Sequence, residues 1–448
     1  MYKIKPKLIV LLLVAMGFSI AASAQAESFE FSLEEAQNYA IKNSYMSISA
    51  DKDVQIADKK VLETIGTGLP QINASANYQK YVQTPLSLIP ASAFGGPEGE
   101  FAEVFLGTEQ QMGINLRAEQ LIFNGSYIVG LQAAQTYLQL SKNDKKKSDI
   151  EVKNMVTVAY GNALVAMRNV EILKGNVKSL EQSAFEIGEL YKSGFAEEQD
   201  KDQIDLTLAN VKNTQEQAVR SVDVVYNQLK FILGMDISST LGLKDDLEKV
   251  TILSSSEEYL TKEFDVASHI DYQIINTQEK ATSLLLKQEK STTLPSLSAF
   301  YNLSSNAFSN EFDFLDNKRF YNGQLVGLNL NIPLFSGFGR MTRIQQAKLN
   351  VEKIEVAKKQ VEQQLAINAQ NSKSQYTFAL SQYKTTEANL ELAQRIYNKT
   401  KIKYEEGISS SLELTQANNQ LLDSQGNYIQ AAFQLIQAKS NLDQALNQ

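Results

Sequence analysis

The second half of the chain repeats the pattern of the first half, with a period of about 213 residues. In each half, a long stretch of helical character is interrupted at a Tyr-x-x-Gly sequence, Tyr191–Gly194 and then Tyr404–Gly407. After each interruption, apolar and small residues recur in alternating steps of four and three residues. This spacing is typical of helices packed as a coiled coil. Because this spacing occurs in both halves, it indicates a duplicated architecture. We therefore expect two pairs of long helices, each pair joined at a tight turn.

Four segments depart from the helical pattern because apolar and polar residues alternate along them. The alternation predicts strands at about 71–83, 110–123, 296–305 and 322–334. A Leu-Pro sequence precedes each pair of strands, and proline ends the preceding helix. A Phe-polar-Gly sequence follows each pair, with Asn or Ser placed to cap the next helix. Each half therefore reads as helix, hairpin, long helix, turn and long helix.

These patterns divide the chain into two repeats joined by a linker. The first repeat is expected at 25–234 and the second at 263–448, with an equatorial linker at 235–262. The helices of the first repeat are expected at about 32–66, 126–191 and 196–234, and those of the second at about 263–292, 337–404 and 409–447.

The first 24 residues have the features of a secretory signal peptide. Three lysines precede an apolar run from Leu8 to Ile20, and small residues follow at Ala22–Ala24. Cleavage after Ala24 or after Ala26 fits this pattern. Removing the three lysines would lower the formal net charge from −8 to about −11. An acidic exported protein is a poor match for nucleic acid, whose phosphates require Lys and Arg.

Composition also argues against catalysis and metal binding. The chain has no cysteine and a single histidine, His269. Thiol chemistry, Cys-ligated metals and most nucleophile constellations are therefore excluded. We expect no enzyme activity, no cofactor and no metal site, and we expect His269 to be a surface or packing residue.

The four strands raise the question of how a single chain could complete a barrel. Closed membrane barrels have at least about eight strands, and an open sheet edge cannot face lipid because its backbone groups would lack partners. If the hairpins enter a membrane, several copies must combine their strands. The alternative is that two hairpins lie on a soluble domain.

In the order and spacing of these features, the chain resembles the outer membrane efflux protein family, the TolC-like channels. The features that carry the resemblance are the signal peptide, the two-fold repeat, Leu-Pro before the first and third strands, Pro333–Gly337 after the fourth strand, and both Tyr-x-x-Gly sequences. The resemblance covers essentially the whole mature chain.

The resemblance implies a mixed α/β membrane protein. Three copies would pool four strands each into a 12-stranded barrel in the outer membrane, above a long periplasmic α-helical barrel. Such a homotrimer serves a tripartite efflux or type I secretion system as a passive conduit. Its partners would be a periplasmic adaptor (membrane fusion protein), an inner-membrane pump and outer-membrane lipid.

The resemblance also assigns candidate functional residues around the two turns. The adaptor-docking tip would comprise Lys192, Ser193, Gly194, Phe195, Glu405, Glu406, Gly407 and Ile408. The periplasmic gate would comprise Tyr404, Asp200 and Glu413, with the Tyr404 hydroxyl reaching Asp200 and three copies of Glu413 forming an acidic ring. There are simpler explanations: glycine suits a left-handed turn, and acids are favoured near helix N-termini.

The sequence leaves a rival from another class, a periplasmic adaptor or structural coiled-coil protein. It does not name the cargo, which could be a drug, a metal ion or a protein. The class of pump and the resting state of the pore are also left open.

Overall fold

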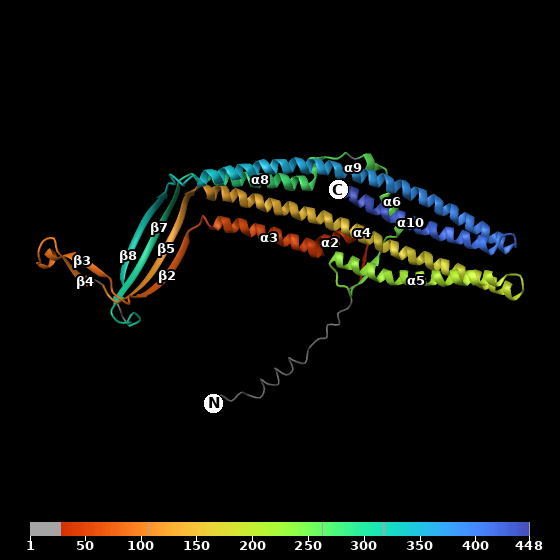
Figure 1. Ribbon diagram of the computed structural model, residues 1–448, viewed down its shortest axis with the longest axis horizontal. Coiled ribbons are helices and arrows are strands. Elements are labelled where there is room, and N and C mark those ends of the chain that lie inside the picture. The colour runs from red at the N-terminus through yellow and green to blue at the C-terminus, as the bar shows by residue number, and fades with distance from the viewer. Residues whose placement is uncertain (1–27, 106, 262, 317–318, 448) are drawn as a thin grey trace, which may run out of the picture. The chain divides into compact units, whose positions relative to one another are not determined.

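The computed structural model describes residues 28–105, 107–261, 263–316 and 319–447 (Figure 1). The predicted signal sequence at 1–24 and both possible cleavage points lie outside the described residues. Within them, none of the helices has both the length and the apolar character needed to cross a bilayer.

The described chain forms two compact units, and each unit takes segments from both predicted repeats. The helix-rich unit contains residues 28–51, 145–270 and 363–447, and the sheet unit contains 52–144 and 271–362. The boundaries of the units therefore cut across the two repeats, because equivalent parts of the two repeats pack on each other.

The helices range from the four-residue α7 to the 68-residue α4. They are α2 (Leu33–Asn43), α3 (Tyr45–Gly66), α4 (Gly125–Lys192), α5 (Glu198–Leu233), α6 (Leu247–Ser254), α7 (Glu258–Thr261), α8 (Ile270–Ser291), α9 (Gly339–Glu405) and α10 (Ser411–Ala445), with 3₁₀ turns at η1 (Ala91–Phe94) and η2 (Val266–Ser268).

Two of the predicted helices are wrong in part. The helix predicted at 32–66 is broken at Ser44, whose backbone is extended and whose hydroxyl accepts from the Ser47 N–H at 3.2 Å. The helix predicted at 263–292 begins only at Ile270, because Asp265 caps the separate turn η2. In both places a polar side chain satisfies backbone donors outside a continuous helix.

Four strands form one antiparallel sheet in the sheet unit. Its order is β2 (Gln71–Lys80), β5 (Gln110–Asn124), β7 (Ser296–Ser309) and β8 (Tyr321–Asn331), as Figure 1 shows. The strands β2 and β8 form the two edges, and neither has a second strand partner among the described residues.

The register places most of the apolar residues of the four strands on one face, with Phe300 and Leu325 as exceptions on the other. Across the sheet, Ala74 pairs with Leu116, and Leu116 pairs with Leu303. One rung away, Tyr301 pairs with Val326, and Val326 is 77% exposed. The opposite face is rich in Asn, Ser and Gln. The protomer therefore leaves a broad apolar sheet face uncovered, which a water-facing sheet would not do.

Two smaller strand pairs were missed by the sequence analysis. The segment between the first two predicted strands holds a hairpin of β3 (Leu86–Pro90) and β4 (Phe101–Phe105). The linker predicted at 235–262 contains β6 (Thr240–Leu243), which pairs in parallel with β1 (Ser28–Phe31), as well as α6 and α7. Strands of four or five residues are too short to show a clear period.

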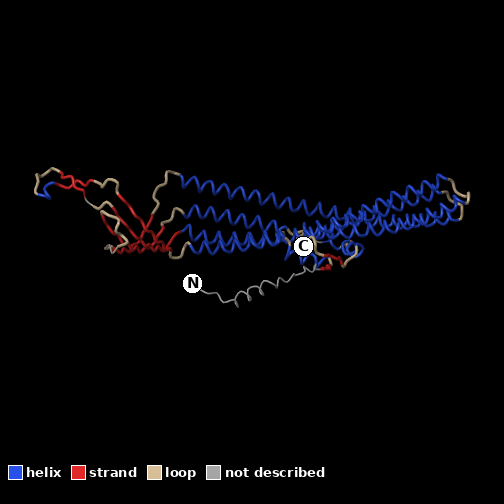
Figure 2. Tube along the Cα trace, turned by 90° about the horizontal axis from the view of Figure 1, so that it is seen from below, coloured by secondary structure: helices blue, strands red, loops and turns tan. Residues whose placement is uncertain are grey.

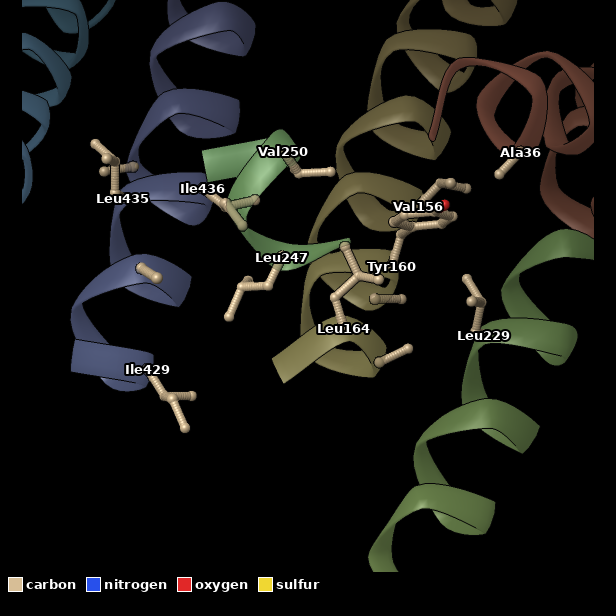
Figure 3. Close-up of a cluster of buried hydrophobic side chains, with 14 of the residues drawn as sticks. Ala36, Val156, Tyr160, Leu164, Leu229, Leu247, Val250, Ile429, Leu435 and Ile436 are labelled. Atoms are coloured by element: carbon tan, nitrogen blue, oxygen red, sulfur yellow. The ribbon is translucent and has the colours of Figure 1, made fainter. Parts of the chain in front are cut away.

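The main core of the helix-rich unit lies where α2, α4, α5, α6, α9 and α10 meet. Figure 3 shows Leu247 and Val250 of α6 between α4 and α10, with Tyr160 of α4 near Leu229 of α5. The Tyr160 hydroxyl donates to the Phe31 carbonyl at 2.9 Å, and burial raises the pKa of this phenol. This bond fixes β1 against the helices.

Two further clusters follow the helices toward the turns. One lies between α4 and α5 and includes Leu180, Ile187 and Ile204; the other lies between α9 and α10 and includes Tyr397 and Leu421. Of these residues, Ile204 and Leu421 belong to the four-and-three spacing that follows the two Tyr-x-x-Gly sequences.

Candidate functional site

The two Tyr-x-x-Gly turns have the same backbone geometry. Gly194 and Gly407 are both left-handed, with φ of 78° and 73°. The following N–H, from Phe195 or Ile408, donates to a carbonyl five residues back at 2.8 Å in both turns. This is a Schellman motif, in which glycine adopts a conformation that costs other residues energy. Figure 2 shows both turns as short loops at the helix ends of the helix-rich unit.

The residue after each glycine is apolar and faces solvent. Phe195 is 83% exposed and Ile408 is 70% exposed. An apolar residue at this place in a Schellman motif commonly packs on the last turn of its own helix. Their high exposure means that neither side chain is used mainly for that contact, so both are available to a partner.

The other predicted tip residues are charged or polar and lie on the surface. Lys192 forms an ion pair with Glu189 at 2.7 Å, and the Ser193 hydroxyl donates to the Glu189 carbonyl at 2.9 Å. In the second turn, the Glu405 carboxylate lies 3.8 Å from the Lys401 ammonium group, and Glu406 is exposed. Exposed ion pairs of this kind contribute little to stability.

The predicted gate acids occupy equivalent positions at the start of α5 and α10. The Asp200 carboxylate accepts from the Glu197 N–H at 3.2 Å, and the Glu413 carboxylate accepts from the Ser410 N–H at 3.1 Å. Each acid therefore caps the helix that follows its turn. Capping explains why a carboxylate stands six residues after each glycine, whatever else the two residues do.

Glu413 receives a second local bond. The Ser409 hydroxyl donates to the Glu413 carboxylate. This bond is the main cause that lowers the pKa of Glu413, and the bond from the Ser410 N–H lowers it further. The carboxyl is therefore held ionised at the protein surface at neutral pH.

Asp200 makes a contact that the sequence analysis missed. The Ser411 hydroxyl donates to its carboxylate, although the two residues are 211 positions apart. The bond joins the start of α5 to the start of α10 and so connects the two helical hairpins beside their turns. The run of three serines at 409–411 was the only sequence signal for it.

Tyr404 lies between the two cores that lead to the turns. Its ring packs against both the α4–α5 cluster and the α9–α10 cluster. Burial raises the pKa of its hydroxyl, and the negative charges of Asp200 and Glu186 add to the shift. Among the described residues no hydrogen bond joins Tyr404 to Asp200, so the bond expected between them stays a prediction.

His269 is buried and lies 6.3 Å, centroid to centroid, from the Phe264 ring. Within the part of the chain that the structure describes, no group of three or more His, Cys, Asp or Glu residues is arranged to hold a metal ion.

Residues 277–448 match the family model described as "Outer membrane efflux protein". The sequence likeness to this family therefore lies in the second repeat. No curated protein is significantly similar in sequence. The family match confirms the predicted family and, with it, the outer-membrane location. The match is to a family of efflux proteins and not to a family of enzymes.

Solved structures extend the likeness to nearly the whole chain. The CmeC outer membrane channel of Campylobacter jejuni has a TM-score of 0.70 at 17% identity, covering 92% of this chain and 85% of its own. CusC has a TM-score of 0.73 at 16% identity, covering 96% and 95%. The open state of the MtrE outer membrane channel of Neisseria gonorrhoeae has a TM-score of 0.71 at 15% identity, covering 92% and 88%. The predicted mixed fold of long helices and paired strands is confirmed.

Proposed function

We propose that this chain is the subunit of a trimeric outer-membrane channel in a tripartite efflux or type I secretion system. The channel is a passive conduit, and the energy for export comes from an inner-membrane pump. The observation that carries the proposal is the four-stranded sheet, which exposes an apolar face and, within the described residues, has two free edges.

The free edges are the reason for an oligomer. Backbone N–H and C=O groups at an edge cannot remain unpaired in lipid, so β2 of one copy must pair with β8 of another. Two copies give eight strands and three give twelve, and both are even numbers that closed barrels adopt. The family resemblance favours three.

Disulfide cross-linking tests this arrangement directly, because the chain has no cysteine of its own. We would place one cysteine at Ser75 in β2 and scan the second through Gly327, Asn329 and Asn331 in β8. All four positions lie on the polar face of the sheet. At the correct register, oxidation in isolated membranes should give covalent dimers and trimers and nothing larger.

The control pair is Asn115 and Ser304, which are register partners on neighbouring central strands of one protomer. Cysteines there should cross-link within one chain and leave a monomer on denaturing gels. The proposal is wrong if the edge pairs give only monomers in membranes, or if they give a ladder that extends beyond three chains.

We further propose that the channel opens at the two turns. Ser411 and Asp200 tie the two hairpins of a protomer together, and Tyr404 fills the space between their cores. An adaptor that binds the exposed Phe195 and Ile408 would act on the same helix ends, because each lies immediately after its turn glycine. Opening would then require the Asp200–Ser411 bond to break.

We propose that Glu413 makes the periplasmic opening of the channel selective for cations. Its carboxylate is exposed and held ionised by two local hydrogen bonds. In a trimer, three such groups around one axis would attract cations and repel anions in a narrow passage.

A further inference from the structure

The strongest feature that the channel proposal leaves unused lies where β8 gives way to α9. A pocket of about 510 Å³ is walled by Leu334, Phe335, Phe338, Met341 and Ile344, with Arg340 among its lining residues. We call it the junction pocket. Its wall is almost entirely apolar, yet it opens to the surface: Leu334 is 90% exposed and Phe338 is 72% exposed.

The junction pocket continues the exposed apolar face of the sheet. Along β8 and just beyond it, every second residue from Val326 to Leu334 is a large exposed aliphatic side chain. Within β8, side chains two apart point to the same side; Ile332 and Leu334 follow directly after the strand, and Leu334 also lines the pocket. The medium that covers this stripe therefore also reaches the pocket.

The backbone of the junction is strained at Phe338. Its φ is 64°, directly after the left-handed Gly337, and phenylalanine rarely adopts this conformation. The Phe335 and Phe338 rings meet edge to face at 5.9 Å between centroids. The strain holds two large rings at the surface, where they gain little from water. Strained residues of this kind cluster at ligand clamps and other functional sites.

The charge at the pocket is positive and unbalanced. Arg340 donates to the Pro333 carbonyl at 3.3 Å, and among the described residues no carboxylate forms an ion pair with it. Arg343, one helical turn further on, differs because Glu289 neutralises it at 3.2 Å. A cation without a partner beside an apolar pocket is suited to a ligand with an acyl chain and an anionic head.

The equivalent junction of the first repeat has the same chemistry. A pocket of about 380 Å³ between β5 and α4 is lined by Phe123, Ile128, Val129 and Leu294, together with Lys287 and Lys290. Among the described residues that line the two pockets, none is an acid. The duplication thus produces two apolar pockets with basic residues, both at the ends of sheet strands.

We infer that the junction pocket binds an anionic phospholipid of the periplasmic leaflet, with an acyl chain against Phe335 and Phe338 and the phosphate on Arg340. The inference rests on the proposed membrane location of the sheet. Aromatic rings and basic side chains are the groups that proteins place at the level of lipid headgroups.

The chain contains no tryptophan, so one introduced indole reports on one position. We would compare Phe335→Trp in the pocket, Leu328→Trp on the sheet stripe and Phe195→Trp at the first turn. Each variant would be reconstituted in vesicles of brominated phosphatidylglycerol or brominated phosphatidylcholine. Bromine on the acyl chain quenches tryptophan only on close approach.

We expect quenching at positions 335 and 328 and none at 195. If the tryptophan at position 328 is quenched but the one at position 335 is not, a neighbouring copy or water covers the pocket. The lipid inference then fails, while the channel proposal stands. If 328 is not quenched either, the sheet does not face lipid, and the channel proposal fails with it.

The headgroup is tested separately in the Phe335→Trp background. Half-maximal quenching by the brominated anionic lipid should need a mole fraction about fivefold lower than quenching by the neutral lipid. This factor is the effect expected of one basic residue near an anionic lipid surface. Arg340→Gln should remove the preference, and Arg340→Lys, which keeps the charge, should retain it. Equal quenching by the two lipids, or loss of the preference in Arg340→Lys as well, would overturn the assignment of the phosphate to Arg340.

Discussion

The bond between Ser411 and Asp200 is the sharpest test of the gate, because a single substitution removes it. In Ser411→Ala the hydroxyl that donates to the Asp200 carboxylate is lost. Ser410, not Ser411, provides the side-chain cap of α10, so the helix start should remain intact. The substitution therefore separates the link between the hairpins from the stability of the helix.

The size of the effect follows from the nature of the bond. A hydrogen bond to a charged group contributes about 1.5–3 kcal/mol net. Because this one is only partly buried, we take a smaller figure of about 1 kcal/mol, which corresponds to about a fivefold change in an equilibrium. If three protomers open together, the closed-to-open equilibrium should shift by about 3 kcal/mol, or more than about a hundredfold.

The assay is single-channel recording in planar bilayers, with open probability and closed-state conductance compared between variants. The matched control is Ser193→Ala in the first turn, because the Ser193 hydroxyl donates only to the Glu189 carbonyl of its own helix. Ser411→Thr, which restores a hydroxyl, should restore the closed state. Equal open probability in Ser411→Ala, Ser193→Ala and the unaltered protein would refute the reasoning.

Three further predictions concern the gate and the core. Tyr404→Phe should raise closed-state conductance by removing a hydroxyl beside Asp200; an unchanged conductance would exclude Tyr404 from the gate. Leu435→Ala should lower the free energy of unfolding by about 2–5 kcal/mol in urea, because Leu435 is fully buried. The exposed Leu412→Ala serves as its control, and similar losses in both would contradict the core assignment. The pKa of Glu413 is lower in the folded protein, so its stabilising contribution is complete above the ordinary glutamate pKa of 4.5 and is lost as pH falls below that value. The difference in melting temperature between the unaltered protein and Glu413→Gln should shrink on acidification, and a constant difference would argue against the bonds to Ser409 and Ser410.

The parts of the fold that could be predicted from sequence are those encoded in local periodicity. Alternation indicated strands at 71–83 and 322–334, and β2 and β8 span Gln71–Lys80 and Tyr321–Asn331. The heptad pattern likewise indicated the seams that pack Ile204 and Leu421 in their clusters. A long periodic segment repeats its signal many times, so the signal outweighs individual exceptions.

The missed elements depend on residues that are distant in the chain. The pairing of β1 with β6 joins Phe31 to Leu243 across four-residue strands. The break at Ser44 lies where α5 ends, and a Cβ on Gly234 would come within 2.1 Å of the Asn43 carbonyl oxygen. Neither feature has a periodic signal of its own, because each exists only once the helices have packed.

For the candidate site, the order of residues was enough to predict the two turns and the positions of the acids. A Tyr-x-x-Gly turn needs a left-handed residue, and an acid at the third position of the next helix satisfies free N–H groups; both requirements are local. Which distant groups those residues meet was set by the packing of the folded chain. That packing placed Ser411 on Asp200, put Tyr404 between two cores and left Phe195 and Ile408 exposed. These contacts depend on how the two hairpins meet, and packing between segments about 200 residues apart has no signature in the order of residues along either one.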